Sequence, residues 1–203
     1  MNKYIIDVGT SYNAPKGISA KKQFKCPAIF IEPEKESLNK VPCDNNDIKL
    51  NIAITSYDGE TEFNYYQTGT HSILETNLDE IDKYIDGYTG KKAIKQKWTA
   101  WKKETVKCLR LDTIINQYSI DSIPYLKIDT QGHDFEVIKS LGDKISIVDE
   151  IECEVQVTKF EVYKNQSKKE EVIRYMEEKS FKLQKSVSQT YGQEENLIFK
   201  RIK

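Results

Sequence analysis

Short runs of mostly apolar residues recur along this chain and constrain its fold more than any other feature. They cover residues 4–9, 28–31, 50–54 and 125–129, and a fifth opens at 145–148 and continues toward Val157. Polar residues do not alternate regularly with apolar ones in these runs, so we expect both faces of each strand to be covered. The pattern predicts short parallel strands inside a sheet.

Helical patterns lie between these runs. Asn13 or Ser11 is placed to cap a helix that carries Pro15 in its first turn. Residues 133–141 put apolar side chains on one helical face before a glycine, and residues 168–179 are amphipathic. This alternation predicts an α/β fold with a doubly wound, mostly parallel sheet and right-handed crossovers.

Two pairs of strands are expected to run antiparallel. Asp58-Gly59 separates residues 52–54 from the alternating residues 61–65, which is a strong hairpin signal. Residues 181–188 and 196–201 give two further strands. We predict that this last pair forms an antiparallel C-terminal hairpin.

Residues 68–103 interrupt the alternation of strand and helix patterns. This stretch is polar and lysine-rich, and it contains Trp98 and Trp101. We expect an insertion, helical in part, on the ligand side of the sheet, within a single domain of residues 1–203. Almost nothing precedes the first strand, where many folds of this type carry a covering helix. Either that helix is absent or the chain is part of a longer protein.

Composition and charge exclude several classes of protein. Lysine and arginine number 31 and aspartate and glutamate 32, and the formal net charge of −1 disfavours a general nucleic-acid binder. No apolar stretch approaches the roughly 18–20 residues that span a bilayer, and the N-terminus lacks a signal-peptide core. The four cysteines lack any CxxC pair, which disfavours a structural zinc site and indicates free thiols in the cytoplasm; they are Cys26, Cys43, Cys108 and Cys153.

Ligands of such a sheet bind outside the carboxyl ends of its strands. The first turn has Gly9 but lacks the further glycines of a dinucleotide site, which argues against a nicotinamide-dependent oxidoreductase. S-adenosylmethionine (SAM) has no phosphates and needs less backbone clearance, and Glu32 is placed to accept both ribose hydroxyls. The cofactor-binding candidates are Asp7, Gly9, Thr10, Ser11, Glu32, Asn51 and Ala53.

The segment 126–134 is the most informative of the chain, because polar residues crowd a strand end, a glycine allows a tight turn and a helix follows at once. We expect Asp129 to point toward the transferred group and His133 to face the same cleft. A capping role for Asp129 and a solvated position for His133 are the structural alternatives. Lys127 is expected to reach solvent from a strand edge.

Several pieces of the chain match one family in that family's order: Ile6–Gly9, Ile31–Pro33, Asn51–Ile54 with Asp58–Gly59 and Phe63, His71–Ile73, Arg110–Thr113 and Leu126–Asp134. On these residues the chain resembles the FkbM-type SAM-dependent methyltransferases. The last piece is specific to the family, whereas the first two are shared by many methyltransferases. The resemblance implies a Rossmann-like class I methyltransferase that acts on a hydroxyl oxygen. Because an alcohol is a poor nucleophile while protonated, we expect Asp129 or His133 to act as the base.

The chain departs from the family pattern in two places. Residues 11–13 stand where the family has a second glycine, and Gln131 stands where it has glutamate. The loss of a negative charge at Gln131 disfavours a tightly held divalent metal, and we predict none.

The acceptor is implied by the resemblance to be a small molecule, above all a glycan sugar. Aromatic faces near Trp98 suit a sugar ring, and the neighbouring lysines suit an anionic acceptor. A solvated amphipathic helix whose tryptophans pack on the core is the alternative. The acceptor candidates are Tyr12, Asn13, His71, Trp98 and Tyr191.

Two other functions stay open. The lysine- and tryptophan-containing segment could bind RNA as a methylation acceptor, which salt-dependent oligonucleotide binding would support. The chain could also be a non-catalytic interaction module with a SAM-type fold. The sequence leaves the acceptor, the hydroxyl group and the oligomeric state undetermined.

Overall fold

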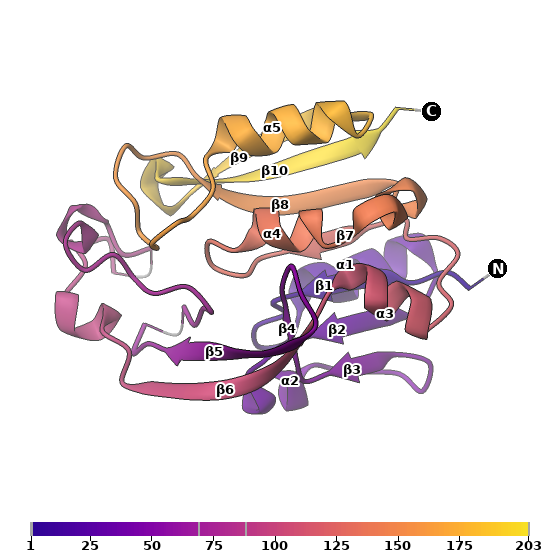
Figure 1. Cartoon of the computed structure of the whole chain (residues 1–203), viewed down its shortest axis with the longest axis horizontal. Helices are drawn as coiled ribbons and strands as arrows, with labels where there is room; N and C mark the ends of the chain where they lie inside the picture. Colours follow the sequence, from indigo (N-terminus) through magenta and orange to yellow (C-terminus); the bar gives the residue numbers. More distant parts are fainter. Residues whose placement is uncertain (1, 69, 88, 203) are drawn as a thin grey trace.

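A seven-stranded sheet forms the body of the computed structural model, which describes residues 2–68, 70–87 and 89–202 (Figure 1). The strands are β1 (Ile5–Val8), β2 (Ala28–Ile31), β3 (Ile48–Leu50), β7 (Leu126–Ile128), β8 (Glu150–Gln156), β9 (Phe181–Gln189) and β10 (Glu194–Arg201). Their order is β3-β2-β1-β7-β8-β10-β9. All neighbouring pairs from β3 to β8 are parallel, and β10 is antiparallel to both β8 and β9. The predicted mostly parallel sheet and its antiparallel C-terminal hairpin are confirmed.

Helices cover both faces of this sheet. Successive residues of its inner strands point to opposite faces, so each inner strand packs against helices on both sides. Ile6 and Val8 belong to a core cluster that also contains residues of α3, α4 and α5, whereas Ile5 belongs to a cluster with α1 and α2. The helices are α1 (Pro15–Phe24), α2 (Lys35–Lys40), α3 (Leu111–Gln117), α4 (Asp134–Lys139) and α5 (Lys169–Glu178). The continuous apolar runs are therefore explained by burial on two sides.

Helix α1 begins at Pro15, as predicted, but neither Ser11 nor Asn13 caps it. The N-cap residue is Ala14, in a left-handed conformation with φ of 41°. The buried carboxylate of Asp7 accepts a hydrogen bond from the backbone N–H of Gly17 instead, at 3.1 Å. The prediction of a local cap was wrong because the donor is satisfied from within the sheet.

A second, three-stranded sheet contains β4 (Ala53–Ile54), β5 (Gly59–Tyr65) and β6 (Lys102–Leu109). The predicted hairpin between β4 and β5 is wrong, because β6 lies between them, parallel to β4 and antiparallel to β5. Asp58 instead contacts the residues that follow β6. Its carboxylate accepts hydrogen bonds from the Arg110 backbone N–H and the Thr113 hydroxyl.

Two other predicted strands are shorter than expected. The run 50–54 divides, since β3 ends at Leu50 and β4 begins at Ala53 in the other sheet. Residues 145–147 belong to a 3-10 helix, η3 (Gly142–Ile147), and β8 begins only at Glu150. An apolar run of this length can be buried equally well as a helical turn, so burial alone did not decide between them.

The segment between β5 and β6 contains only short 3-10 helices, η1 (Ile81–Lys83) and η2 (Lys95–Trp98), among its described residues. An aromatic cluster holds it together: the Trp98 ring lies 6.5, 5.2 and 6.2 Å from the rings of Tyr66, Tyr84 and Tyr163. Tyr163 comes from the loop between β8 and α5, which lies beside this segment at one end of the molecule (Figure 1). No helix in the described part of the chain is long and apolar enough to cross a membrane.

Candidate active site

A cleft opens at the carboxyl ends of β1, β2 and β7, where the sequence predicted a ligand site. Its free space, counted out to the open mouth, is about 900 Å³. Eight of the predicted site residues line it: Gly9, Ser11, Tyr12, Glu32, Ala53, His71, Asp129 and His133. The parallel arrangement brings these strand ends to one edge of the sheet, as expected.

The loops after β1 and β7 touch each other through their backbones at the bottom of the cleft. Gly9 has φ of +71°, and a Cβ atom on it would lie 1.8 Å from the carbonyl oxygen of Asp129. Only glycine permits this approach, because any side chain would collide with backbone that cannot rotate away. The loop after β1 and the loop that carries Asp129 are therefore held in fixed relation.

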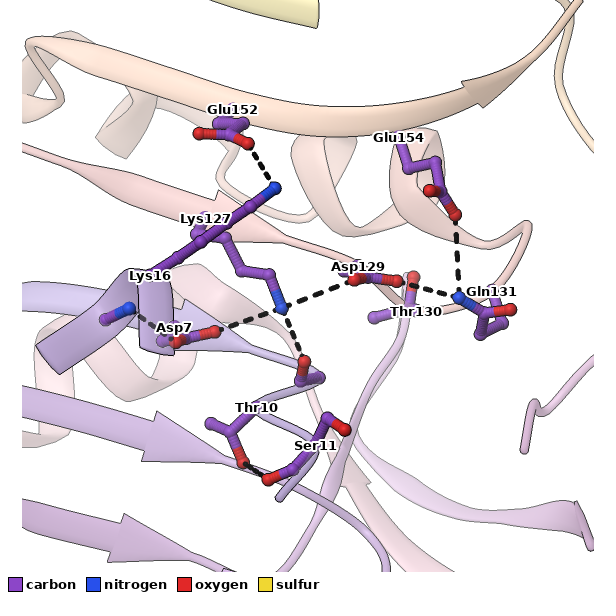
Figure 2. A network of polar contacts seen from close by, with 12 residues as sticks. Asp7, Thr10, Ser11, Lys16, Lys127, Asp129, Thr130, Gln131, Glu152 and Glu154 are labelled. Atoms are coloured by element: carbon purple, nitrogen blue, oxygen red, sulfur yellow. Dashed lines mark hydrogen bonds and ion pairs between the residues drawn. The ribbon is translucent and has the colours of Figure 1, made fainter. Parts of the chain in front are cut away.

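A buried ammonium group ties the same loops together (Figure 2). The Nζ atom of Lys127 donates a hydrogen bond to the carbonyl oxygen of Gly9 at 2.6 Å, and lies 3.3 Å from Asp7 and 3.6 Å from Asp129. Lys127 is only 5% exposed, so the expectation that it reaches solvent was wrong. Burial alone would lower its pKa, but the negative charges of Asp7 and Asp129 outweigh this and raise it.

Glu32 forms the wall of the cleft at the end of β2. Its carboxylate accepts hydrogen bonds from the backbone N–H groups of Ser11 at 3.3 Å and Glu34 at 3.0 Å. Burial raises the pKa of Glu32 to about 7, although both hydrogen bonds act in the opposite direction. The side chain is thus positioned and ready to accept hydrogen bonds, and a ligand that donates to it would favour its charged form.

Asp129 directly follows β7, and its side chain is 35% exposed. One oxygen accepts a hydrogen bond from the Gln131 side-chain amide at 2.8 Å, and the same amide lies 3.5 Å from Glu154. No side chain of the described residues caps α4, and Asp134 rather than Asp129 stabilises the turn after β7, because the Asp134 carboxylate accepts hydrogen bonds from the backbone N–H groups of Thr130 and Glu154. Asp129 is therefore free to face the cleft.

His133 also borders the cleft, from the position just before α4. Burial lowers its pKa to about 4, so its imidazole is neutral at physiological pH. Its Nε2 atom is buried and has no hydrogen-bond partner. The solvated position considered for it from sequence was wrong.

The chain was compared with models of known protein families. A profile described as "Methyltransferase FkbM domain" matches residues 7–183. The chain belongs to the FkbM methyltransferase family. No match was found among curated proteins. The resemblance seen in the motifs is confirmed.

Within this FkbM domain, the remaining cofactor candidates lie around the cleft rather than on its surface. Asp7 and Thr10 are buried beneath the first loop, each 1% exposed. The Asn51 side chain donates hydrogen bonds to the backbone carbonyls of Glu32 and Pro33, at 3.0 and 2.6 Å. Asn51 therefore supports the segment that carries Glu32.

The acceptor candidates of the FkbM domain are divided by the structure. Tyr12 and His71 line the cleft, but Asn13, Trp98 and Tyr191 do not. Trp98 is 2% exposed in its aromatic cluster, whereas Tyr191 is 68% exposed in the 3-10 helix η4 (Thr190–Gly192).

His71 is oriented by two contacts. Its Nδ1 atom accepts from the Tyr66 backbone N–H at 3.1 Å, and its Nε2 atom lies 3.4 Å from the Glu34 carboxylate. Burial lowers the pKa of His71, although Glu34 acts to raise it.

Sequence reasoning missed Glu154 and gave Lys127 the wrong environment. Burial raises the pKa of Glu154 well above its usual range, with the charge of Asp129 as the next cause. One sequence signal could have found both residues, because each is a charged residue within a strand that also carries apolar residues, Lys127 in β7 and Glu154 in β8. In the described part of the chain, no group of three or more His, Cys, Asp or Glu side chains is arranged to hold a metal ion. All four cysteines are free thiols.

Proposed function

We propose that this FkbM domain is a SAM-dependent O-methyltransferase that modifies a hydroxyl group of a saccharide, with Asp129 as the general base. The observation that carries the proposal is the position of the Asp129 carboxylate. It is partly exposed in the same cleft as Glu32, and its backbone contacts Gly9. A base and a ribose-binding acid therefore face one space.

The shape and chemistry of the cleft fit SAM. Glu32 would hold the ribose hydroxyls through its two oxygens, and the narrow turn at Gly9 would leave room for the amino-acid end. The carboxylates of Glu32, Glu34 and Asp129 surround the cleft and favour a cationic ligand. The strand order, with antiparallel β10 between β8 and β9, supports a Rossmann-like class I arrangement.

When bound, SAM supplies a methyl carbon that its sulfonium group has activated. The protein must then align the acceptor hydroxyl and remove its proton. A base within hydrogen-bond reach contributes about 10²–10⁴-fold. We favour Asp129 over His133, because the Asp129 side chain is 35% exposed in the cleft, whereas the Nε2 atom of His133 is buried without a hydrogen-bond partner among the described residues.

A saccharide acceptor is supported by the polar side chains on the outer wall of the cleft, Thr70 and His71, next to the apolar ring of Phe63. RNA is less well supported. Two lysines next to Trp101 are paired with acids, since Lys103 contacts Glu62 and Glu75 at 2.7 and 3.0 Å and Lys102 contacts Glu104 at 2.9 Å. We propose the cytoplasm as the location, in keeping with the free thiols.

The test is to incubate the protein with methyl-labelled SAM and a panel of oligosaccharides and to look by mass spectrometry for one added methyl group. Asp129→Asn should abolish turnover while the dissociation constant for S-adenosylhomocysteine, measured by calorimetry, stays within about twofold of wild type. Asp79→Asn is the matched control, because the Asp79 side chain is 97% exposed and remote from the cleft lining. Turnover that persists in Asp129→Asn would remove the base assignment.

A further inference from the structure

A row of aromatic rings continues from the wall of the cleft to the surface of the molecule. Phe63 and His71 line the cleft. The Tyr65 ring lies 5.1 Å from Phe63 and 5.0 Å from His71, and 6.1 Å from the ring of Trp101. Trp101 is therefore two ring contacts away from the cleft wall, at the outer end of the row.

Trp101 is exposed in a way that packing does not require. Its exposed fraction is 61%, whereas Trp98, three residues earlier, is 2% exposed. The backbone around Trp101 is nevertheless fixed, because its N–H donates to the carbonyl oxygen of Tyr65 at 3.0 Å, just before β6 begins. An ordered strand end thus presents a large aromatic face to solvent, and tryptophan is enriched at binding surfaces.

Charged groups lie next to Tyr65, the ring that Trp101 contacts. The Nζ atom of Lys102 lies 4.6 Å from the centre of the Tyr65 ring and donates to Glu104 at 2.9 Å. The Tyr65 hydroxyl also donates to Glu104, at 2.9 Å. A sugar ring matches such a surface, because its C–H face packs on an aromatic ring while its hydroxyl groups hydrogen-bond to a carboxylate or an ammonium group.

We propose that Trp101, which contacts the buried ring of Tyr65, forms an outer sugar subsite together with Lys102 and Glu104. It would hold a ring adjacent to the one that is methylated, so that the acceptor is an oligosaccharide rather than a free monosaccharide. This inference rests on the proposed function of the cleft. Its continuity with the cleft through Tyr65 and His71 is what connects the two sites.

Binding can be tested without turnover, because the chain has only 2 tryptophans. In a ¹⁵N-labelled sample the two indole N–H signals are assigned with Trp101→Phe, and the sample is titrated with cellotetraose, maltotetraose and chitotetraose and with the matching monosaccharides. We expect a tetrasaccharide to shift the Trp101 signal and to leave the buried Trp98 signal in place. If none of the tetrasaccharides moves the Trp101 signal, or if a simple phenol moves it equally, the subsite assignment is wrong.

Turnover gives the second test. With an acceptor from the oligosaccharide panel, Trp101→Ala should raise the KM for that oligosaccharide about tenfold or more, with kcat and the affinity for S-adenosylhomocysteine unchanged. Tyr57→Ala is the matched control, since Tyr57 is also exposed, at 49%, but lies beyond the opposite end of β5. An unchanged KM in Trp101→Ala would overturn the inference while leaving methyl transfer intact.

The two proposals fail in different ways. If no acceptor is methylated but a tetrasaccharide shifts the Trp101 signal, the subsite stands and the catalytic proposal fails. A dimer in sedimentation experiments that becomes monomeric in Trp101→Ala would assign the exposed ring to self-association and overturn the subsite.

Discussion

Replacement of Lys127 by methionine should severely destabilise the protein. The substitution keeps most of the side-chain volume but removes the ammonium group 3.3 Å from Asp7. Asp7 is 1% exposed and Lys127 5%, so a buried carboxylate would be left without its counter-charge. Removal of one partner of a buried pair costs about 3–5 kcal/mol, a large part of the roughly 5–15 kcal/mol that stabilises a typical domain.

The loss should depend on pH in a defined direction. Burial already raises the pKa of Asp7 above 3.8, and the positive charge of Lys127 holds it down. Without Lys127 the pKa of Asp7 in the folded state should rise further. A carboxyl group with a raised folded-state pKa loses stability as the pH rises through that value, so Lys127→Met should be more stable at pH 5 than at pH 7.

The measurement is urea denaturation at pH 5, 6, 7 and 8, followed by tryptophan fluorescence. Lys16→Met is the matched control, because Lys16 pairs with Glu152 but its side chain is 41% exposed, and we expect a loss below about 1 kcal/mol there. The double variant Asp7→Asn/Lys127→Met should recover part of the stability, since both charges are gone. If Lys127→Met lowers the free energy of unfolding no more than Lys16→Met does at every pH, the stabilising role of the buried Lys127–Asp7 pair is contradicted.

Two further predictions concern the cleft. Because burial raises the pKa of Glu32 to about 7, S-adenosylhomocysteine should bind several-fold more tightly at pH 8 than at pH 6, as the carboxylate becomes charged, and Glu32→Gln should bind more weakly with little pH dependence. Calorimetry at both pH values measures this, and equal affinities would contradict the ribose role. Gly9→Ala should weaken binding of the same ligand by tenfold or more, because a Cβ atom there would lie 1.8 Å from the Asp129 carbonyl oxygen. Gly87→Ala is the control, since its Cβ would meet nothing closer than 3.5 Å, and binding that survives in Gly9→Ala would show that the two loops can separate.

The sequence predicted the position of the cleft because that prediction needs only the ends of three strands and their parallel arrangement. Gly9, Glu32 and Asp129 each follow an apolar strand, and parallel strands bring their carboxyl ends to one edge. The same patterns could not tell that β6 separates β4 from β5, because strand pairing across the inserted segment depends on contacts distant in sequence.

The two tryptophans show another limit of sequence patterns. Trp98 and Trp101 have similar lysine-rich surroundings in the sequence, yet one is buried and the other exposed. The environment of Trp98 depends on Tyr163, which reaches the inserted segment from a loop beyond β8, whereas Trp101 contacts only the ring of Tyr65 among the aromatic contacts of the described residues. Lys127 illustrates the same point, because only the structure shows two carboxylates on either side of it.

The backbone contact between Gly9 and Asp129 also bears on how such a domain can diversify. Any change that separates these turns would disturb both the floor of the cleft at Gly9 and the position of Asp129, the proposed base, so substitutions there have little freedom. The segment between β5 and β6 meets the Asp129 loop through lighter contacts, such as the Ser72 hydroxyl, which donates to the Gln131 carbonyl oxygen at 2.8 Å. If the proposed function holds, grafting that segment from one relative onto another should exchange acceptor preference while the Gly9–Asp129 contact is retained.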